Sequence, residues 1–216
     1  MLPLVHLNKV QRLLFLGAHC DDIEIGAGGT IARLIEQYPK LSVCWVVFGG
    51  EDPVRVKEAR RSARVYLAGA GKKDVIVHGY RDGYMPFQGE QIKESFEELK
   101  QSFAPDLILT HHDNDRHQDH RLISEMTWNT WRDHTILEYE IFKYDGDLGR
   151  PNLYVPLSEE VCREKVSRLF KSYPSQAKRA WFTEDTFWSL LRLRGAECNS
   201  PSRFAEAFYV RKLVVA

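Results

Sequence analysis

Two short clusters of histidine and carboxylate side chains are the parts of this sequence most capable of chemistry. The first, residues 18–26 (AHCDDIEIG), follows an apolar run at 13–17, and the second, residues 111–120 (HHDNDRHQDH), follows another apolar run at 107–110. Histidine, aspartate and glutamate are the ligands that zinc takes when a site must stay open for catalysis. We therefore interpret the two clusters as two halves of one metal site.

The first cluster contains adjacent carboxylates that can divide the work of hydrolysis. One of Asp21 and Asp22 can bind a metal while the other faces the water that attacks, since a metal lowers the pKa of water and a nearby carboxylate takes the proton. The alternative interpretation is that His19 and these acids form an N-cap and a surface loop. The glycines at 26–29 begin too far from the strand end for a dinucleotide fingerprint, and we expect them to let the loop turn and the following helix pack closely.

The second cluster offers two imidazoles on one face of a predicted helix. His117 and His120 are three residues apart, so they share a face at the helix start. One could bind metal while the other donates a hydrogen bond to the reacting carbonyl oxygen. Asp119 could orient an imidazole by accepting from its other N–H group. His111 and His112 are rivals for the ligand role, although a histidine that ends a strand is often only structural.

Apolar runs that alternate with helix-period segments predict the elements that position these clusters. Alternation of this kind is typical of parallel βαβ units, and unbroken apolar strands are typical of a sheet covered on both faces. We expect an α/β fold of the Rossmann-like, three-layer α/β/α type, with a mostly parallel sheet of order 3-2-1-4-5 plus C-terminal additions. The crevice beyond neighbouring strands one and four is then the ligand site, and both clusters would meet there. The predicted strands are 11–17, 41–48, 74–78 and 106–110, and the predicted helices are 28–38, 54–69 and 90–103.

The last third of the chain gives a weaker pattern. We expect a strand at 137–144, a helix with Ser158 as its N-cap, a helix at 182–194 and a strand near the end of 204–215. The chain has 216 residues, of which 44% are hydrophobic, and this is enough for one packed core. We therefore expect residues 1–216 to form a single domain.

The composition argues against several classes of protein and of binding partner. Lys+Arg and Asp+Glu both number 30, so no basic excess indicates a nucleic-acid partner. The four cysteines show no C-x-x-C spacing, which argues against a disulfide framework or a zinc ribbon. The N-terminus lacks a signal-peptide pattern, and no apolar run is long enough for a membrane span. We expect a cytoplasmic protein without an integral membrane segment that acts on a small molecule, and homo-oligomerisation stays open.

The motifs resemble those of the LmbE-like or PIG-L de-N-acetylases. Residues 18–30 (AHCDDIEIGAGGT) are similar to the first family motif, A-H-P-D-D-x-E-I-G-x-G-G-T, with Cys20 in place of a proline that would fix the backbone. Residues 117–120 (HQDH) are similar to the second motif, H-P-D-H, with Gln118 in place of proline. Weaker similarities extend the resemblance to roughly residues 12 to 208, at Gly50-Glu51, Arg55-x-x-Glu58, 173–176 and 203–208.

This resemblance implies a zinc-dependent hydrolase that removes the acetyl group from an N-acetylglucosamine conjugate and holds one Zn²⁺ per chain. It implies that His19, Asp22 and His120 are the zinc ligands. It also implies that Asp21 is the general base. His117 would stabilise the oxyanion or protonate the leaving amine.

The remaining candidate residues would support catalysis or bind the sugar. Asp119 could stand behind His117, and the resemblance implies that Arg55 approaches sugar hydroxyls while Glu58 holds it. Arg81 and Asp82 follow the third predicted strand and could supply polar contacts to the sugar. Two alternatives stay open: a metal-dependent hydrolase of another amide, ester or phosphoester bond, and a catalytically silent sugar-binding scaffold. The group attached to the sugar cannot be read from the sequence.

Overall fold

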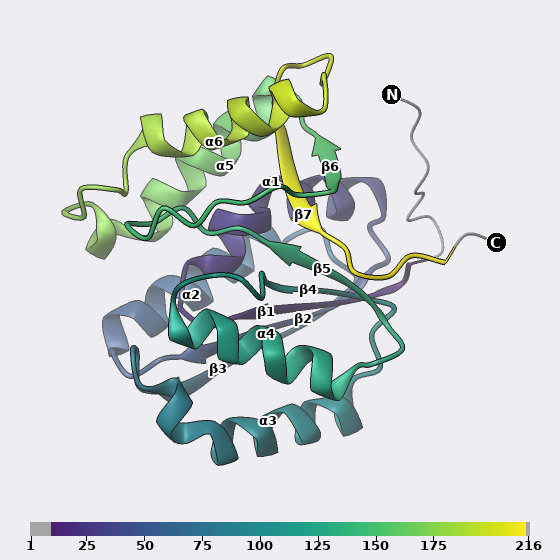
Figure 1. The fold of residues 1–216 in the computed structure, drawn as a ribbon, viewed down its shortest axis with the longest axis vertical. Helices are drawn as coiled ribbons and strands as arrows, with labels where there is room; N and C mark the ends of the chain where they lie inside the picture. Colours follow the sequence, from purple (N-terminus) through teal and green to yellow (C-terminus); the bar gives the residue numbers. More distant parts are fainter. Residues whose placement is uncertain (1–9, 215–216) are drawn as a thin grey trace.

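The computed structural model describes residues 10–214, and its centre is a seven-stranded sheet of order β3-β2-β1-β4-β5-β7-β6 (Figure 1). The strands are β1 (Arg12–Gly17), β2 (Ser42–Gly49), β3 (Lys72–Tyr80), β4 (Leu107–His111), β5 (Thr135–Tyr139), β6 (Leu153–Pro156) and β7 (Ala205–Tyr209). The helices are α1 (Asp22–Gln37), α2 (Pro53–Tyr66), α3 (Gly89–Ser102), α4 (Gln118–Thr130), α5 (Glu159–Ser172) and α6 (Glu184–Glu197), with short 3-10 helices η1 (Met85–Gln88) and η2 (Pro174–Gln176).

The predicted strand order is confirmed. β1 pairs in parallel with β2 and with β4, while β3 and β5 extend the parallel sheet on either side. β7 then pairs antiparallel with both β5 and β6, and these two strands are the C-terminal additions. The carboxyl ends of β1 and β4 therefore meet at one edge of the sheet, as the sequence predicts.

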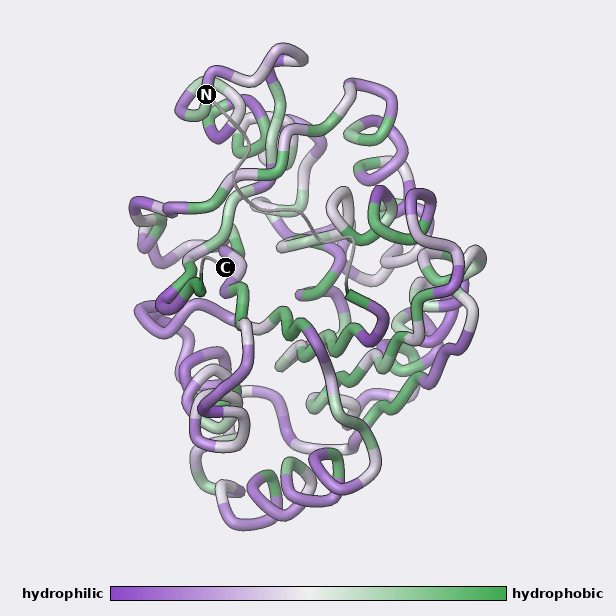
Figure 2. Tube along the Cα trace, turned by 90° about the vertical axis from the view of Figure 1, so that its right-hand side faces the viewer, coloured by the Kyte–Doolittle hydropathy of each residue, from purple (hydrophilic) through white to green (hydrophobic). Residues whose placement is uncertain are grey.

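The sheet separates two hydrophobic cores, because alternate residues of each strand point to opposite faces. Leu13 and Phe15 pack into the core that α1, α2, α5 and α6 cover, and Leu14 and Leu16 pack into the core under α3 and α4. Figure 2 shows hydrophobic residues along the central strands and hydrophilic residues on the outer helical turns. This three-layer arrangement agrees with the predicted Rossmann-like class. Among residues 10–214, no helix is both long and apolar enough to cross a membrane.

Helix α1 begins at Asp22, earlier than the predicted 28–38 helix. The glycines at 26–29 therefore lie inside the helix and not in a loop, and their role is close packing. A Cβ atom at Gly26 would lie 2.3 Å from the ring of Tyr139, and one at Gly29 would lie 2.4 Å from Leu157. The first turns of the helix that carries the first cluster therefore pack closely against neighbouring side chains, including Tyr139 of the sheet.

An ion pair is inserted beside the middle of α1. The Lys165 ammonium donates to the Ile25 carbonyl at 2.6 Å and to Glu206 at 2.6 Å. Glu206 in turn accepts from the backbone N–H groups of Gly29 and Thr30 at 2.7 and 2.6 Å. The Ile25 carbonyl and the Gly29 amide are four residues apart and face the same turn of α1, so the pair contacts both backbone groups of that turn. Residues from α5 and β7 therefore fix the course of α1.

The C-terminal elements differ from prediction in their bounds. The strand expected at 137–144 occupies Thr135–Tyr139, and the one expected near the end of 204–215 occupies Ala205–Tyr209. β6 is only four residues long and ends in proline, so its pattern gives no clear strand signal. Ser158 is the N-cap of α5, as predicted, and accepts from the N–H of Val161 at 3.2 Å.

Candidate metal and catalytic site

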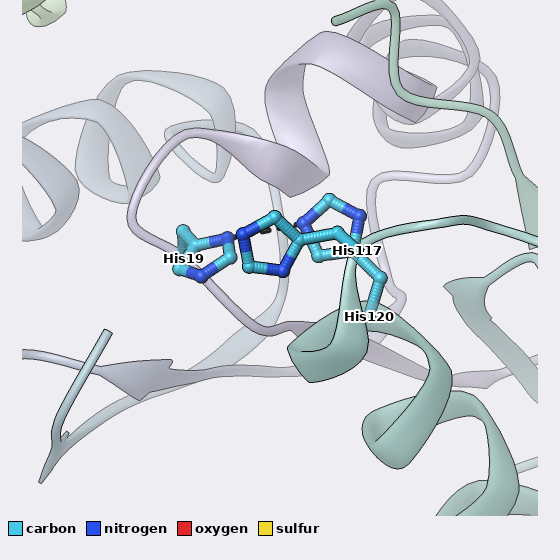
Figure 3. Close-up of side chains that lie close together, drawn as sticks. All are labelled: His19, His117 and His120. Atoms are coloured by element: carbon cyan, nitrogen blue, oxygen red, sulfur yellow. Dashed lines mark hydrogen bonds between the residues drawn. The ribbon is translucent and has the colours of Figure 1, made fainter. Parts of the chain in front are cut away.

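The two sequence clusters meet where β1 leads into α1 and β4 leads toward α4. Figure 3 shows His19, from the loop after β1, with its ring directed toward His117 and His120 at the start of α4. The centroid of the His19 ring lies 4.7 Å from that of His117 and 5.0 Å from that of His120. Residues about 100 positions apart in the chain are therefore brought into one site, as the predicted strand order requires.

Three ligand atoms face one another at the spacing of a zinc site. His19 Nδ1 lies 3.0 Å from His120 Nε2 and 3.3 Å from Asp22 Oδ2, and His120 Nε2 lies 3.5 Å from Asp22 Oδ2. Zinc bonds of 2.0–2.1 Å in tetrahedral geometry separate neighbouring ligand atoms by roughly 3.3 Å. The three residues predicted as ligands therefore have the right donor types and the right spacing for zinc.

The charges around these atoms also suit a cation. Burial, with the neighbouring His111, lowers the pKa of His120 to about 3, so its ring is neutral and able to coordinate. Burial acts on His19 in the same direction, but attraction to Asp22 and the hydrogen bonds that His19 donates to Asp119 and Asp82 raise the pKa of His19 well above its usual range. The region between the carboxylates thus favours positive charge, which a divalent metal would supply.

Carboxylates behind the two imidazoles fix which nitrogen each presents. His120 Nδ1 donates to Asp115 Oδ2 at 2.9 Å, which leaves Nε2 for a metal. Asp115 also pairs with the Lys143 ammonium at 2.9 Å. Burial opposes ionisation of Asp115, but the His120 hydrogen bond and the attraction to His120, His111 and Lys143 together outweigh it and hold the pKa of this carboxyl well below its usual range. Asp115 and Lys143 were not among the predicted site residues.

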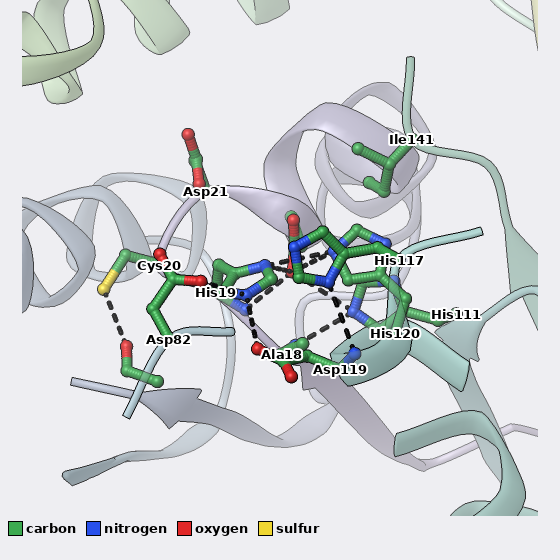
Figure 4. Close-up of polar contacts among 12 residues, drawn as sticks. Ala18, His19, Cys20, Asp21, Asp82, His111, His117, Asp119, His120 and Ile141 are labelled. Carbon is green, nitrogen blue, oxygen red and sulfur yellow. Dashed lines mark hydrogen bonds and ion pairs between the residues drawn. The ribbon is translucent and has the colours of Figure 1, made fainter. Parts of the chain in front are cut away.

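Asp119 stands behind a different imidazole from the one expected. Its Oδ2 lies 3.2 Å from His19 Nε2 (Figure 4). Its carboxylate also accepts from the N–H groups of Gly83 and Met85 at 2.7 and 3.2 Å. Asp119 thus orients His19 and joins the loop after β3 to the site. The side chain of Asp82 contacts the same His19 nitrogen at 3.1 Å from the solvent side.

His117 presents a hydrogen-bond donor to the cavity. It is the N-cap of α4, and its Nδ1 accepts from the N–H of Asp119 at 3.3 Å. The proton of the neutral ring must then be on Nε2. Burial and the neighbouring His19 lower the pKa of His117, which favours the neutral ring. The resemblance implies that His117 stabilises the oxyanion or protonates the leaving amine, and a neutral ring with an Nε2–H donor suits the first of these roles.

Asp21 and Arg55 form the opposite wall. Asp21 Oδ1 accepts from Arg55 Nη2 at 2.7 Å, while burial raises the pKa of Asp21 despite this cation. Arg55 also donates to Glu58 at 3.1 Å, as the resemblance implies. Glu58 is buried, and it also accepts from the N–H and the hydroxyl of Ser175. Glu58 therefore supports Arg55 and does not itself line the cavity.

Of the two rival histidines, His111 lies close to the predicted ligands and His112 lies away from them. His111 Nε2 is 3.2 Å from Asp22 Oδ2, but it accepts from the N–H of Ala18 at 2.9 Å and is fully buried beneath His120. Its Nδ1 is buried without a hydrogen-bond partner among the described residues. His112 donates from Nδ1 to Glu138 Oε2 at 2.8 Å and stacks on Tyr209, which indicates a structural role.

Cys20, at the position where the family motif has proline, ties the ligand loop to the sheet. Its thiol donates to the Gly49 carbonyl at 3.2 Å, at the end of β2. Burial raises the pKa of this thiol to about 12, so it stays protonated. A side-chain hydrogen bond therefore restrains the loop at a point where a proline ring would do so covalently.

A cavity of about 630 Å³ opens over these residues, a volume suited to a small ligand. Arg81 is not among its lining residues and stacks on Tyr84 at 3.7 Å, whereas Asp82 does line the cavity. The outer wall comes from the loops after β5 and α5, which carry no recognisable motif apart from Gln176. The residues that line the whole cavity are His19, Cys20, Asp21, Asp22, Gly49, Glu51, Asp52, Arg55, Asp82, His117, His120, Ile141, Lys143, Tyr144, Asp145, Gln176, Arg179 and Trp181.

Comparisons with known proteins identify a matching family and a related sequence. The family model described as PIG-L, GlcNAc-PI de-N-acetylase, matches residues 14–131. An Escherichia coli protein described as uncharacterized deacetylase YaiS is 27% identical over 170 residues, which cover 76% of this chain and 91% of that protein.

Solved structures share the fold at low sequence identity. The N,N'-diacetylchitobiose deacetylase from Pyrococcus horikoshii aligns with a TM-score of 0.74 at 20% identity, covering 94% of this chain and 85% of that one. The 4-carboxy-2-hydroxymuconate hydratase GalB from Pseudomonas putida aligns with a TM-score of 0.70 at 15% identity, covering 95% and 98%. Because a hydratase shares the fold, the fold alone does not identify the reaction.

Proposed function

The chain belongs to the PIG-L family, described as GlcNAc-PI de-N-acetylases, and from this premise we propose that it is a zinc-dependent hydrolase that removes the acetyl group from an N-acetylglucosamine-type conjugate. The observation that carries this proposal is the set of mutual distances, 3.0 to 3.5 Å, among His19 Nδ1, Asp22 Oδ2 and His120 Nε2. A carboxylate and an imidazole donor, Asp21 and His117, line the same cavity.

A zinc ion held by His19, Asp22 and His120 would polarise the acetyl carbonyl and lower the pKa of a water molecule. Asp21 then takes the proton from the attacking water. Its Oδ1 is held by Arg55, and among the described residues no hydrogen bond engages its Oδ2, which is free to receive that proton. The raised pKa of Asp21 makes it a better base than an exposed aspartate.

His117 acts on the carbonyl oxygen. Its Nε2–H is fixed by the N-cap contact and donates to the oxygen as negative charge develops there. A positioned donor of this kind contributes ~3–4 kcal/mol to transition-state stabilisation. The proton held by Asp21 passes to the amine nitrogen as the C–N bond breaks, and the products are acetate and a free amine.

The proposal is tested by metal content and by chemistry together. We expect elemental analysis to find about one zinc per chain, and N-acetylglucosamine conjugates to release acetate and amine. Zinc without release from any N-acetylated sugar would favour a hydrolase of another amide, ester or phosphoester bond. Failure to bind zinc even when it is added would contradict the ligand set and favour a silent sugar-binding scaffold.

The role of Asp21 is tested by Asp21→Asn, which keeps the shape of the side chain. We expect this variant to bind zinc as the wild type does and to lose activity by a factor of about 10² to 10⁴, the usual contribution of a general base. Loss of zinc from this variant would mean that Asp21 is a ligand, and near-normal activity would mean that another group takes the proton.

A further inference from the structure

The exposed part of the cavity lining carries more carboxylates than cations. Five charged side chains of the lining are exposed, and together we call them the rim: Glu51, Asp52, Asp82, Asp145 and Arg179. They come from the loops after β2, β3, β5 and η2, so four separate segments contribute to the rim. Four of the five are acidic, so their effect on a ligand depends on whether other cations of the cavity balance them.

The two cations deeper in the cavity cannot provide this balance, because buried carboxylates already engage them. Arg55 contacts Asp21 at 2.7 Å, and only 16% of its side chain is exposed. Lys143 contacts Asp115 at 2.9 Å and Asp147 at 2.6 Å, and only 10% of its side chain is exposed. Breaking either buried pair to bind a ligand anion would leave a buried carboxylate without its partner, which is costly.

The rim carboxylates themselves are nearly free of cations. Among residues 10–214, no lysine or arginine nitrogen lies within 4.0 Å of Glu51, Asp52 or Asp82, and Asp145 reaches Lys143 only at 3.9 Å. Among the described residues, Arg179 has no carboxylate within the same distance. Asp82 contacts His19 Nε2 at 3.1 Å, so its charge is shared with the proposed metal site. Asp22, Asp115 and Asp119 would meet the charge of a bound zinc ion, and Glu51, Asp52 and Asp145 then outnumber Arg179 at the opening.

We propose that the rim selects the group attached to the acetylated sugar. This group is a second, linked sugar that carries a positively charged amino group. The rim carboxylates attract such a group. Trp181 and Tyr144 also line the cavity, and their aromatic rings can pack on a sugar ring or a cation. A group with a carboxylate or phosphate meets repulsion from the rim. This inference rests on the proposed deacetylation, since it assumes that the acetylated sugar lies in the cavity next to the proposed zinc ligands.

The test compares three disaccharides that differ only in the charge of the second sugar. N-acetylglucosamine is joined β1,4 to glucosamine, to N-acetylglucosamine or to glucuronic acid, so that the charged group lies away from the zinc ligands. Binding is measured by calorimetry on zinc-loaded His117→Asn protein, which keeps every carboxylate and cation of the cavity and should consume the ligand only slowly. Acetate release is measured on the wild type. Acetate release tests the proposed deacetylation, and the order of affinities tests the inference, so the two can fail separately.

We expect the cationic disaccharide to bind roughly tenfold more tightly than the anionic one at low salt, with the neutral one between them. The difference should shrink to about twofold in about 0.5 M salt, because the rim is exposed and its charges are screened. Asp145→Asn should reduce the preference about threefold and Arg179→Gln should increase it by a similar factor.

The matched control is Glu94→Gln on α3, an exposed carboxylate outside the cavity, which should leave the preference unchanged. Equal or tighter binding of the anionic disaccharide would overturn the inference. So would a preference that rim variants alter no more than Glu94→Gln does, or the absence of binding by all three disaccharides.

Discussion

Asp115→Asn should weaken zinc binding without touching a ligand atom. In the wild type, Asp115 Oδ2 accepts from His120 Nδ1 at 2.9 Å, so that Nε2 of His120 is directed at the zinc position with its lone pair free. Only 3% of the Asp115 side chain is exposed, so solvent screens this contact little. Removal of a buried carboxylate behind a histidine ligand typically costs 10- to 100-fold in metal affinity.

We expect the upper part of that range, because the same carboxylate also pairs with Lys143 at 2.9 Å. An asparagine amide turned toward Lys143 would place an NH₂ group against an ammonium, and the alternative orientation would place it against the His120 N–H. A 100-fold loss corresponds to about 2.7 kcal/mol of binding free energy. Competition with a chromophoric chelator measures this loss directly and independently of activity.

The matched control is Asp147→Asn, which removes the other carboxylate of Lys143, at 2.6 Å, and leaves the His120 contact in place. This variant should keep zinc affinity within about threefold of the wild type. Wild-type zinc affinity in Asp115→Asn would refute the orientation argument. Equal losses in the two variants would mean that Lys143, and not the tautomer of His120, determines the affinity.

Two further predictions concern the fold that carries the site. Glu206→Gln should lower the free energy of unfolding by about 3–5 kcal/mol in urea titrations, because Lys165 is left buried without its carboxylate; a cost under about 1 kcal/mol would mean that water takes its place. Gly26→Ala should cost about 1–3 kcal/mol or more, because its Cβ atom would lie 2.3 Å from the Tyr139 ring, whereas Gly79→Ala, with no atom within 4 Å, should cost much less; similar losses would argue against close packing of α1.

The strand order is predictable from the sequence because it depends on local patterns. Unbroken apolar runs followed by polar clusters identify buried strands and the ends at which sites form. His19, Asp22 and His120 then follow from the resemblance, and their donor atoms lie within 3.5 Å of one another. The metal-site assignment itself stays a prediction until zinc is measured.

What the sequence could not provide depends on contacts between distant segments. Asp119 orients His19 and not His117, because the loop after β3 holds its carboxylate through two backbone N–H groups. Asp115 lies within the second cluster, but its partner Lys143 comes from a loop predicted as strand. Apart from Gln176, the cavity wall at 141–145 and 176–181 has no motif, since exposed loops need not repeat a pattern.

The ion pair beside α1 joins the C-terminal third of the chain to the helix that carries the first cluster. The family match stops at residue 131, and both sequence clusters lie within it. Yet Lys165 and Glu206 hold the Ile25 carbonyl and the Gly29 amide, one turn after Asp22. A fragment cut at the end of the match would keep every proposed ligand and lose the ion pair that holds the helix on which Asp22 lies. The C-terminal third therefore supports the proposed metal site, and variants there belong in any study of metal binding.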